Sequence, residues 1–199
     1  SRMAKYEGGD CDLDPKTGVL RNRLGITDEQ RLEQAEASLV AWRSYELSQK
    51  PLAGDFDLAH LQAIHRHLFG DVYDWAGEIR TIDLSKGNTY FAHHAHIVSA
   101  ARLIFENLKK EQYFRGLNAD AFSERAAYYL GEINALHPFR EGNGRAQREF
   151  INHLAWANGY TIDWRAINPH ELMQASIESF HRGDATPLAD LIKVNLQDR

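Results

Sequence analysis

The chain has 199 residues, of which 43% are hydrophobic and 26% are charged, values typical of one globular domain with a sizeable core. A formal net charge of −5 disfavours direct binding to nucleic acid, and no apolar run approaches the roughly 18 residues of a membrane span. The single cysteine, Cys11, excludes an internal disulfide and indicates a reducing compartment. With no secretory signal visible, we expect a cytoplasmic protein without a membrane partner.

The N-terminal part of the chain predicts an irregular arm and two helices. Residues 1–26 are rich in turn signals, so we expect an arm without regular structure. Thr27 begins a sequence typical of a capping box, which predicts a helix over 27–49 with Trp42 on its buried face. A second helix is predicted over 57–69, with an aspartate cap at its start and a glycine after its end.

Residues 79–94 carry the one convincing β pattern. Gly87 and Asn88 separate two short runs rich in β-branched and aromatic residues, which predicts a β-hairpin. An ordinary surface hairpin would explain this pattern as well as a functional one.

Histidines cluster at two places in the chain. His93, His94 and His96 follow the hairpin, but adjacent histidines on an extended segment point to opposite faces, so we expect no zinc site there. His65 and His67 are two residues apart and would not share a face of a helix, so we expect surface or capping roles for both.

The rest of the chain is helical in pattern, apart from one short loop. Apolar residues at helical spacing and cap signals predict helices over 97–112, 120–136, 144–157, 168–181 and 186–196. We therefore expect a mainly α-helical bundle with one β-hairpin.

The loop between the second and third of these spans, 120–136 and 144–157, carries most of the candidate chemistry. It contains the sequence His137-Pro138-Phe139-Arg140-Glu141-Gly142-Asn143-Gly144-Arg145-Ala146-Gln147-Arg148. Because proline disfavours helical backbone at the residue before it, we expect His137 to be extended. The two glycines around Asn143 suit a tight turn whose amides form an anion-binding nest at the start of the next helix.

The charged residues of this loop indicate phosphate chemistry. Arg145 and Arg148 share a face of the first helical turn, where cations are unfavourable unless an anion offsets them. Glu141 would repel a phosphate unless a divalent cation such as Mg²⁺ bridges the two. His137 can accept a proton at neutral pH, so the residues indicate a nucleoside triphosphate, Mg²⁺ and a histidine base that activates a hydroxyl.

This stretch resembles the signature of the Fic (filamentation induced by cAMP) family, His-x-Phe-x-Asp/Glu-Gly-Asn-Gly-Arg-x-x-Arg. All eight defined positions match. The resemblance implies that residues 1–199 form one Fic domain, a helical bundle with its motif at 137–148 and a hairpin flap at 79–94 near the active site. It implies a protein adenylyltransferase, which moves AMP from ATP to a hydroxyl side chain of a target protein.

The resemblance also implies a role for each motif residue. His137 would be the catalytic base, Glu141 the Mg²⁺ ligand and Phe139 a structural anchor. The phosphates of ATP would be bound by Gly142, Asn143, Gly144, Arg145 and Arg148. The flap would position the target through Ser85, Lys86, Gly87, Asn88, Thr89, Tyr90 and Phe91.

Regulation and target are implied by the same resemblance. Many Fic proteins carry an inhibitory helix with the sequence Ser/Thr-x-x-x-Glu-Gly/Asn, and no glutamate of this chain has that context. The chain therefore resembles toxin-type Fic proteins, in which a separate small antitoxin supplies a glutamate to the second motif arginine, here Arg148. Such toxins modify DNA gyrase and topoisomerase IV, which implies these proteins as targets.

Three alternatives stay open. Some Fic relatives transfer other nucleoside monophosphates, phosphocholine or phosphate. The chain is also compatible with the catalytic domain of a longer effector that is translocated into a target cell. A partner-binding module without transferase activity is disfavoured, because the motif is complete.

Overall fold

The computed structural model describes residues 4–5 and 10–199, and it is mainly helical, as the sequence predicts. The helices are α1 (Glu29–Gln49), α2 (Leu58–Phe69), α3 (Ile97–Lys110), α4 (Ala119–Leu136), α5 (Asn143–Ala157), α6 (Pro169–Arg182) and α7 (Thr186–Val194). Short 3₁₀ turns are η1 (His94–His96), η2 (Gln112–Phe114) and η3 (Trp164–Ala166). None of the helices in the described residues has the length and apolar character that a bilayer span requires.

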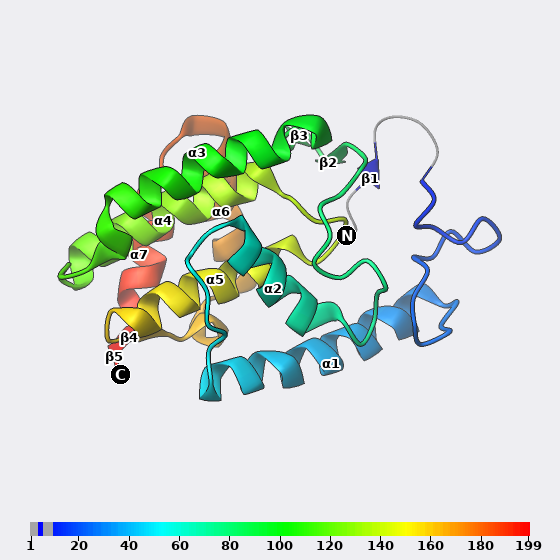
Figure 1. Ribbon diagram of the computed structural model, residues 1–199, viewed down its shortest axis with the longest axis horizontal. Coiled ribbons are helices and arrows are strands. Elements are labelled where there is room, and N and C mark those ends of the chain that lie inside the picture. Colours follow the sequence, from blue (N-terminus) through cyan, green and yellow to red (C-terminus); the bar gives the residue numbers. More distant parts are fainter. Residues whose placement is uncertain (1–3, 6–9) are drawn as a thin grey trace.

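The bundle is built around α4 and α5. Helix α4 packs against α3, α5, α6 and α7, while α5 also packs against α2, and α2 against α1. In Figure 1, α3 and α4 run along one side of the molecule and α1 along the other, with α2 and α5 between them. Large side chains that are less than 2% exposed fill the space between these helices, namely Phe69, Tyr73, Phe114, Phe122, Tyr129, Phe139 and Phe150.

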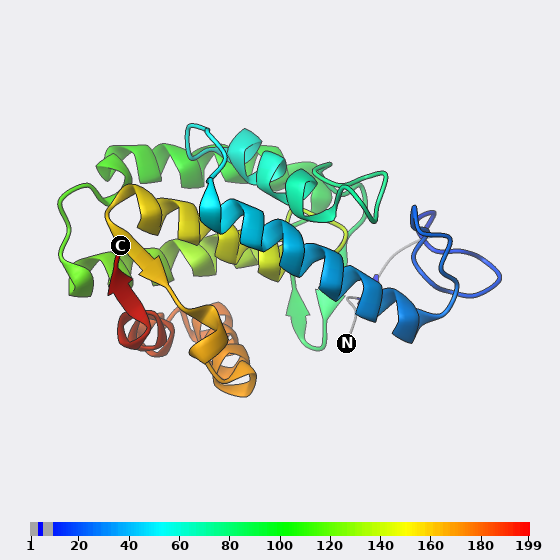
Figure 2. The same cartoon turned by 90° about the horizontal axis from the view of Figure 1, so that it is seen from below.

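Two small antiparallel sheets accompany the helices. Strands β2 (Leu84–Lys86) and β3 (Thr89–Tyr90) form the predicted hairpin, which is shorter than the predicted span. Strand β1 (Ala4–Lys5) pairs with β2, so the sheet order is β1-β2-β3. Strands β4 (Tyr160–Ile162) and β5 (Leu196–Asp198) form a second sheet that the sequence did not predict. In Figure 2 the hairpin tip points toward the same side as α6 and α7.

The predicted N-terminal arm is irregular over most of its described length. The exceptions are β1 and an isolated antiparallel bridge between Leu13 and Leu20. The arm is anchored on the motif loop, because Arg140 Nη2 donates to Asp10 Oδ2 at 2.5 Å and both side chains are buried. Residues 1–3 and 6–9 of the predicted arm lie outside the described residues.

Helix α1 differs from its prediction in its cap and in its buried face. Asp28, not Thr27, is the N-cap, and its side chain accepts a hydrogen bond from the backbone N–H of Arg31. A capping box needs glutamate or glutamine three residues after the cap, and arginine occupies that position. Trp42 is 58% exposed, so its predicted burial is wrong. The buried stripe of α1 instead includes the charged residue Glu36.

Three buried histidines support the bundle in their neutral form. His60, His65 and His153 each donate from one ring nitrogen to a backbone carbonyl and accept from a backbone N–H at the other. Protonation would turn each accepting nitrogen into a donor that faces another donor. Burial lowers the pKa of His65 to about 3 and that of His153 to about 4, and it also lowers the pKa of His60.

We expect the free energy of unfolding to fall as the pH drops from 7 to 5. The unfolded chain takes up protons at these histidines near pH 6.5 and the folded chain does not, so the loss over this window is roughly 2–5 kcal/mol. Urea unfolding at both pH values measures it. His153→Gln should weaken the pH dependence, whereas His170→Gln, at an exposed position, should not. Equal unfolding free energies at the two pH values would contradict this expectation.

Candidate active site

The motif loop connects α4 to α5, and its first residue, His137, has an unexpected backbone conformation. His137 is the C-cap of α4 with φ 47° and ψ 63°, in the left-handed region, so the expectation of an extended backbone is wrong. Pro138 disfavours the right-handed helical region, but the N–H of His137 still donates to the Ile133 carbonyl at 2.9 Å. This bond closes the helix through a left-handed cap, which fixes the start of the His137 side chain.

The imidazole of His137 is buried, and its hydrogen bond defines its tautomer. Nδ1 lies 3.0 Å from the Asn134 carbonyl oxygen, which can only accept, so Nδ1 carries the proton and Nε2 the lone pair. The ring of Phe91 stacks on the imidazole, with centroids 3.7 Å apart and planes at 11°. Burial lowers the pKa of His137 to about 3. The imidazole is therefore neutral near pH 7, with Nε2 able to accept a proton.

Side-chain contacts within the loop hold its shape. Asn143 Oδ1 accepts from the N–H of Phe139 at 2.9 Å, and Asn143 Nδ2 donates to the Phe139 carbonyl at 2.7 Å. Gly142 has a φ of 79°, and a Cβ there would lie 2.2 Å from the Phe69 ring, so only glycine fits. Because the Asn143 side chain bonds to the loop, a phosphate contact from this residue would come from its backbone N–H.

His65 braces the loop from α2, so the expectation of a surface or capping role is wrong for it. It is fully buried, and its Nε2 donates to the Glu141 carbonyl at 2.8 Å. Its ring stacks on that of Phe139 with centroids 3.9 Å apart, while Nδ1 accepts from the N–H of Gly77 at 2.9 Å. Spacing along α2 could not reveal that one of its faces meets a loop 76 residues later.

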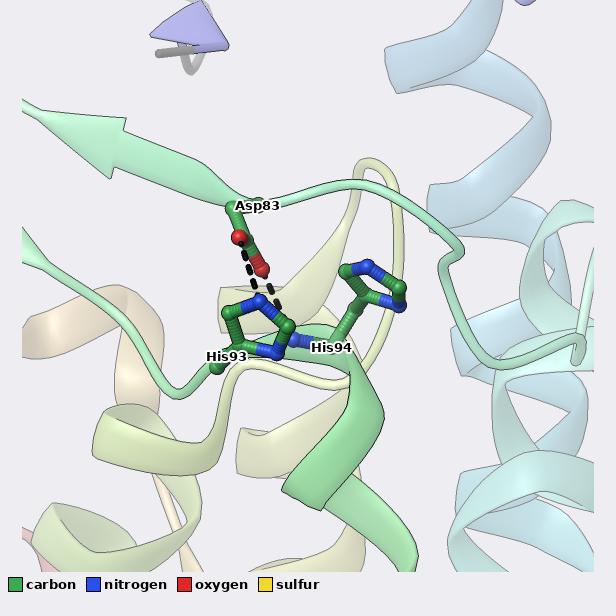
Figure 3. Close-up of side chains that lie close together, drawn as sticks. All are labelled: Asp83, His93 and His94. Carbon is green, nitrogen blue, oxygen red and sulfur yellow. Dashed lines mark hydrogen bonds and ion pairs between the residues drawn. The ribbon is translucent and has the colours of Figure 1, made fainter. Parts of the chain in front are cut away.

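Asp83, His93 and His94 meet at the base of the hairpin (Figure 3). The expectation that the adjacent histidines point apart is wrong, because the chain turns there. His93 has φ −59° and ψ 133° and caps η1, which begins at His94. The two rings therefore stack, with centroids 4.7 Å apart and planes at 24°.

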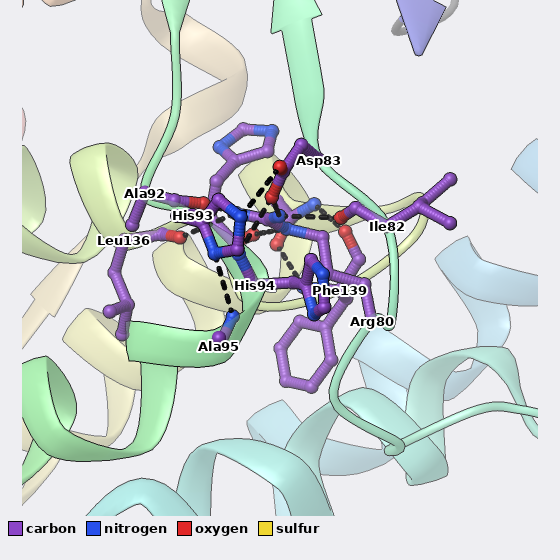
Figure 4. Close-up of polar contacts among 11 residues, drawn as sticks. Arg80, Ile82, Asp83, Ala92, His93, His94, Ala95, Leu136 and Phe139 are labelled. Atoms are coloured by element: carbon purple, nitrogen blue, oxygen red, sulfur yellow. Dashed lines mark hydrogen bonds and ion pairs between the residues drawn. The ribbon is translucent and has the colours of Figure 1, made fainter. Parts of the chain in front are cut away.

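Arg80 joins the hairpin to the motif loop (Figure 4). Its guanidinium is fully buried and donates to four backbone carbonyls, those of Ile82 (2.7 Å), Ala92 (2.5 Å), Leu136 (3.2 Å) and His137 (2.6 Å). Its backbone N–H donates to the Pro138 carbonyl at 2.9 Å. The first two acceptors flank the hairpin and the others belong to the end of α4, so one side chain sets the position of the hairpin over His137.

The hairpin covers the motif loop and contacts α6. A hydrogen bond of 3.1 Å joins Thr89 Oγ1 to His181 Nε2, and the Phe91 ring meets the Phe180 ring edge-on with centroids 6.0 Å apart. In the sheet of the described residues, β3 is an outer strand, and its Tyr90 is 61% exposed. An exposed strand edge of this kind can pair with a segment of another chain.

The first motif arginine, Arg145, is held by α1. It forms an ion pair with Glu36 through Nη2, and its guanidinium lies over the Phe69 ring, 4.8 Å from the centroid. The hydroxyl of Tyr73 also donates to Glu36. A bound phosphate would therefore share Arg145 with Glu36. Glu36 is a site residue that the sequence did not indicate, because a lone glutamate in an amphipathic helix carries no signal of its partner.

The second motif arginine, Arg148, has no such partner. Among the residues that the structure describes, its guanidinium has no hydrogen bond or ion pair. Burial and the nearby charge of Arg145 lower the pKa of Arg148. Only the nearby Glu149 carboxylate offsets this charge in part, so Arg148 places a cation without a direct partner near the start of α5, where the helix dipole already favours an anion.

A groove of about 670 Å³ lies beside the two arginines. It runs between α1, α5, β4 and η3, and Arg145 and Arg148 are among its lining residues. Its apolar walls include Val40, Leu47, Trp156, Ile162 and Trp164. The groove therefore combines an apolar surface with the two motif arginines, and the carboxylates of Glu149 and Asp163 also line it.

Glu141 precedes the turn and is the candidate Mg²⁺ ligand. Its Oε1 accepts from the N–H of Gly142 at 3.4 Å, which keeps the carboxylate at the N-terminal end of α5. The first N–H groups of a helix lack partners within the helix, so phosphate oxygens fit there. One carboxylate beside bound phosphates suits Mg²⁺, so the residues fit the expected ion.

A buried neutral imidazole, the N-terminal end of a helix and a covering hairpin lie together in this candidate site. Residues 55–155 match a model of the Fic/DOC family, and relatives of similar length match over most of the chain. The chain therefore belongs to the Fic/DOC family.

Named relatives agree with this assignment. The chain is 51% identical to protein adenylyltransferase VbhT of Bartonella schoenbuchensis over 98% of the chain and 41% of that protein, so it spans less than half of this relative. It is 42% identical to the probable protein adenylyltransferase Fic of Escherichia coli, over 92% of the chain and 90% of that protein. The solved structure of BepC from Bartonella tribocorum with bound AMPPNP superposes with a TM-score of 0.87 at 28% identity, covering 94% of this chain and 97% of that one.

Removing the Phe91 ring should raise the pKa of His137 from about 3 toward its usual 6.5, because the imidazole would regain water. An NMR titration of the histidine ring protons in Phe91→Ala measures this shift. Tyr90→Ala, which removes an exposed neighbour, is the matched control and should leave the pKa low. An unchanged His137 pKa in Phe91→Ala would show that the hairpin does not cause the desolvation.

Proposed function

We propose that this chain is a protein adenylyltransferase that moves AMP from ATP to a hydroxyl side chain of a target protein. The observation that carries the proposal is the neutral imidazole of His137, whose Nε2 has a lone pair that can accept a proton. This histidine is the first residue of a complete Fic motif. The named relatives are protein adenylyltransferases, and BepC binds AMPPNP, a triphosphate. Because ATP is the donor, the cytoplasm is the proposed place of action.

In the proposed reaction, His137 Nε2 takes the proton of the target hydroxyl as its oxygen attacks the α-phosphorus. A phosphorus–oxygen bond to the target forms while the bond from the α-phosphorus to the β-phosphate oxygen breaks, and pyrophosphate leaves. The phosphates are bound by the turn and first helical residues Gly142, Asn143, Gly144, Arg145 and Arg148. Mg²⁺ held by Glu141 would supply additional charge neutralisation.

The hairpin positions the target in this proposal. Phe91 covers the imidazole, so the hairpin has to shift before a hydroxyl can reach Nε2. The outer position of β3 supports pairing with a target segment, in line with the expected role of Ser85, Lys86, Gly87, Asn88, Thr89, Tyr90 and Phe91.

The extent of the domain and the target are further parts of the proposal. Helices α6 and α7 lie outside the matched residues 55–155, yet both pack on α4 and α6 contacts the hairpin, which supports one domain over the whole chain. As targets we propose DNA gyrase and topoisomerase IV. These targets are proposed from the resemblance to toxin-type Fic proteins. Identification of the protein that becomes labelled in the transfer assay tests whether they are the targets.

We expect His137→Ala to keep ATP binding and to lose transfer by at least about two orders of magnitude, the usual worth of general-base help. Transfer of α-labelled ATP to lysate proteins measures it, with UTP, GTP and CDP-choline as competing donors. Glu141→Ala should require more Mg²⁺ for the same rate. His170→Ala, at an exposed position, is the control. If His137→Ala retained transfer, His137 would not be the catalytic base. If the unmodified chain labelled no protein, the alternative of a partner-binding module without transferase activity would be favoured.

We also propose that a small antitoxin restrains this enzyme by supplying a glutamate to Arg148. The Arg148 guanidinium, which has no hydrogen bond or ion pair among the described residues, and the adjoining groove support this partner, because an amphipathic helix with one carboxylate would contact both. Bound there, the carboxylate would occupy the position that a γ-phosphate needs.

A small protein encoded beside this chain should inhibit transfer if it supplies this glutamate. Ala41→Glu places a negative charge, of the same sign as the partner's glutamate, on the exposed wall of the groove. We expect it to weaken inhibition at least ~10-fold while transfer itself persists. Titration of the purified small protein into the labelling assay measures both. Equal transfer at every concentration of that protein would contradict the proposed restraint.

A further inference from the structure

One carboxylate and two imidazoles converge at the two ends of the hairpin. Asp83 directly precedes β2, and His93 and His94 follow β3 (Figure 3). One potential ligand atom from each lies within 4.8 Å of the other two. These residues belong to neither the motif loop nor the groove beside it.

Asp83 and His93 form an ion pair whose place a metal ion would take, and with a metal on Nε2 the His93 Nδ1 would carry the proton and give up its contact with the Ala95 N–H. His93 Nε2 is 3.1 Å from Asp83 Oδ2, and ligand atoms in a tetrahedral zinc site lie about 3.3 Å apart for bonds near 2.0 Å. Asp83 Oδ1 accepts from the backbone N–H of His94 at 2.8 Å, which orients the carboxylate as outer hydrogen bonds do in metal sites. The His94 ring has to approach by at most about 1.5 Å, within the reach of side-chain rotation.

Exposure and charge are compatible with a cation here. Asp83 is buried while the His93 side chain is 49% exposed. The cluster therefore has one ligand that is held in place by the fold and one side that solvent ions can reach. The Arg80 guanidinium is the neighbouring positive charge, with Nη1 3.9 Å from Asp83 Oδ1. It donates to four carbonyls and lies near Oδ1, whereas the imidazole of His93 faces Oδ2.

We propose that Asp83, His93 and His94 bind a divalent transition-metal ion such as Zn²⁺. Imidazole nitrogens with one carboxylate suit Zn²⁺, Ni²⁺ or Cu²⁺, whereas Mg²⁺ prefers oxygen ligands, so the Mg²⁺ of the proposed reaction does not compete. Three protein ligands leave a position for water. The ion joins the two ends of the hairpin, so it restrains the segment that carries Phe91 over His137.

Calorimetric titration of the untagged chain with Zn²⁺ in the presence of excess Mg²⁺ tests the site. We expect one ion per chain, visible absorption when Co²⁺ replaces Zn²⁺, and at least ~10-fold weaker binding in His93→Asn and His94→Asn. The His93→Asn side chain can still cap η1, and Asp83→Asn can still accept from the His94 N–H, so both variants keep the local fold. His170→Asn is the control. Binding that is absent, or equal in all variants, would overturn the proposal.

A second measurement tests the restraint on the hairpin. Trypsin cleavage after the exposed Lys86 should slow when Zn²⁺ is added to the unmodified chain, and not in His93→Asn. Circular dichroism of each variant confirms that its helices are intact. Zn²⁺ binding with an unchanged cleavage rate would overturn the restraint.

Discussion

The geometry of the candidate site depends on the buried guanidinium of Arg80. Four backbone carbonyls, two partly buried beside the hairpin and two buried at the end of α4, would lose this donor if the side chain were absent. Each unmet buried acceptor costs about 1–3 kcal/mol. A lysine presents one compact charge, whereas the guanidinium fork reaches several directions at once. The cap at His137 and the ring of Phe91 are therefore positioned by one group.

The two motif arginines divide the handling of charge between them. Glu36 and Tyr73 hold Arg145 in place before any ligand arrives, so this cation is already oriented. Arg148 is half-buried and has no hydrogen bond or ion pair among the described residues, so only the nearby Glu149 charge offsets its partial desolvation. Such a cost is typical of sites where a ligand supplies the missing charge. A phosphate and a partner carboxylate would both do so, and in the proposed function the two would compete for Arg148.

Much of the fold and the motif could be predicted from the sequence, and the failures share a physical reason. Helix spans and the hairpin follow from local periodicity, and the loop over 137–148 follows from its own residue types. The sequence did not reveal the roles of His65, Arg80 and Glu36, because these roles depend on partners more than 50 residues away. The left-handed conformation of His137 escaped because a proline excludes one backbone region without choosing between the others.

The closed hairpin has a chemical consequence for the proposed base. While Phe91 covers the ring, desolvation keeps His137 neutral but also makes it a weak base. In the proposed reaction, a target segment that pairs along β3 and displaces Phe91 would bring a polar hydroxyl to Nε2 and end that desolvation. The hydrogen bond from Nδ1 to Asn134 persists through this change, because it belongs to α4 and not to the hairpin. The binding of the target hydroxyl and the recovery of the basicity of His137 would thus occur together. His137 would be a strong base only when a substrate is present to be deprotonated.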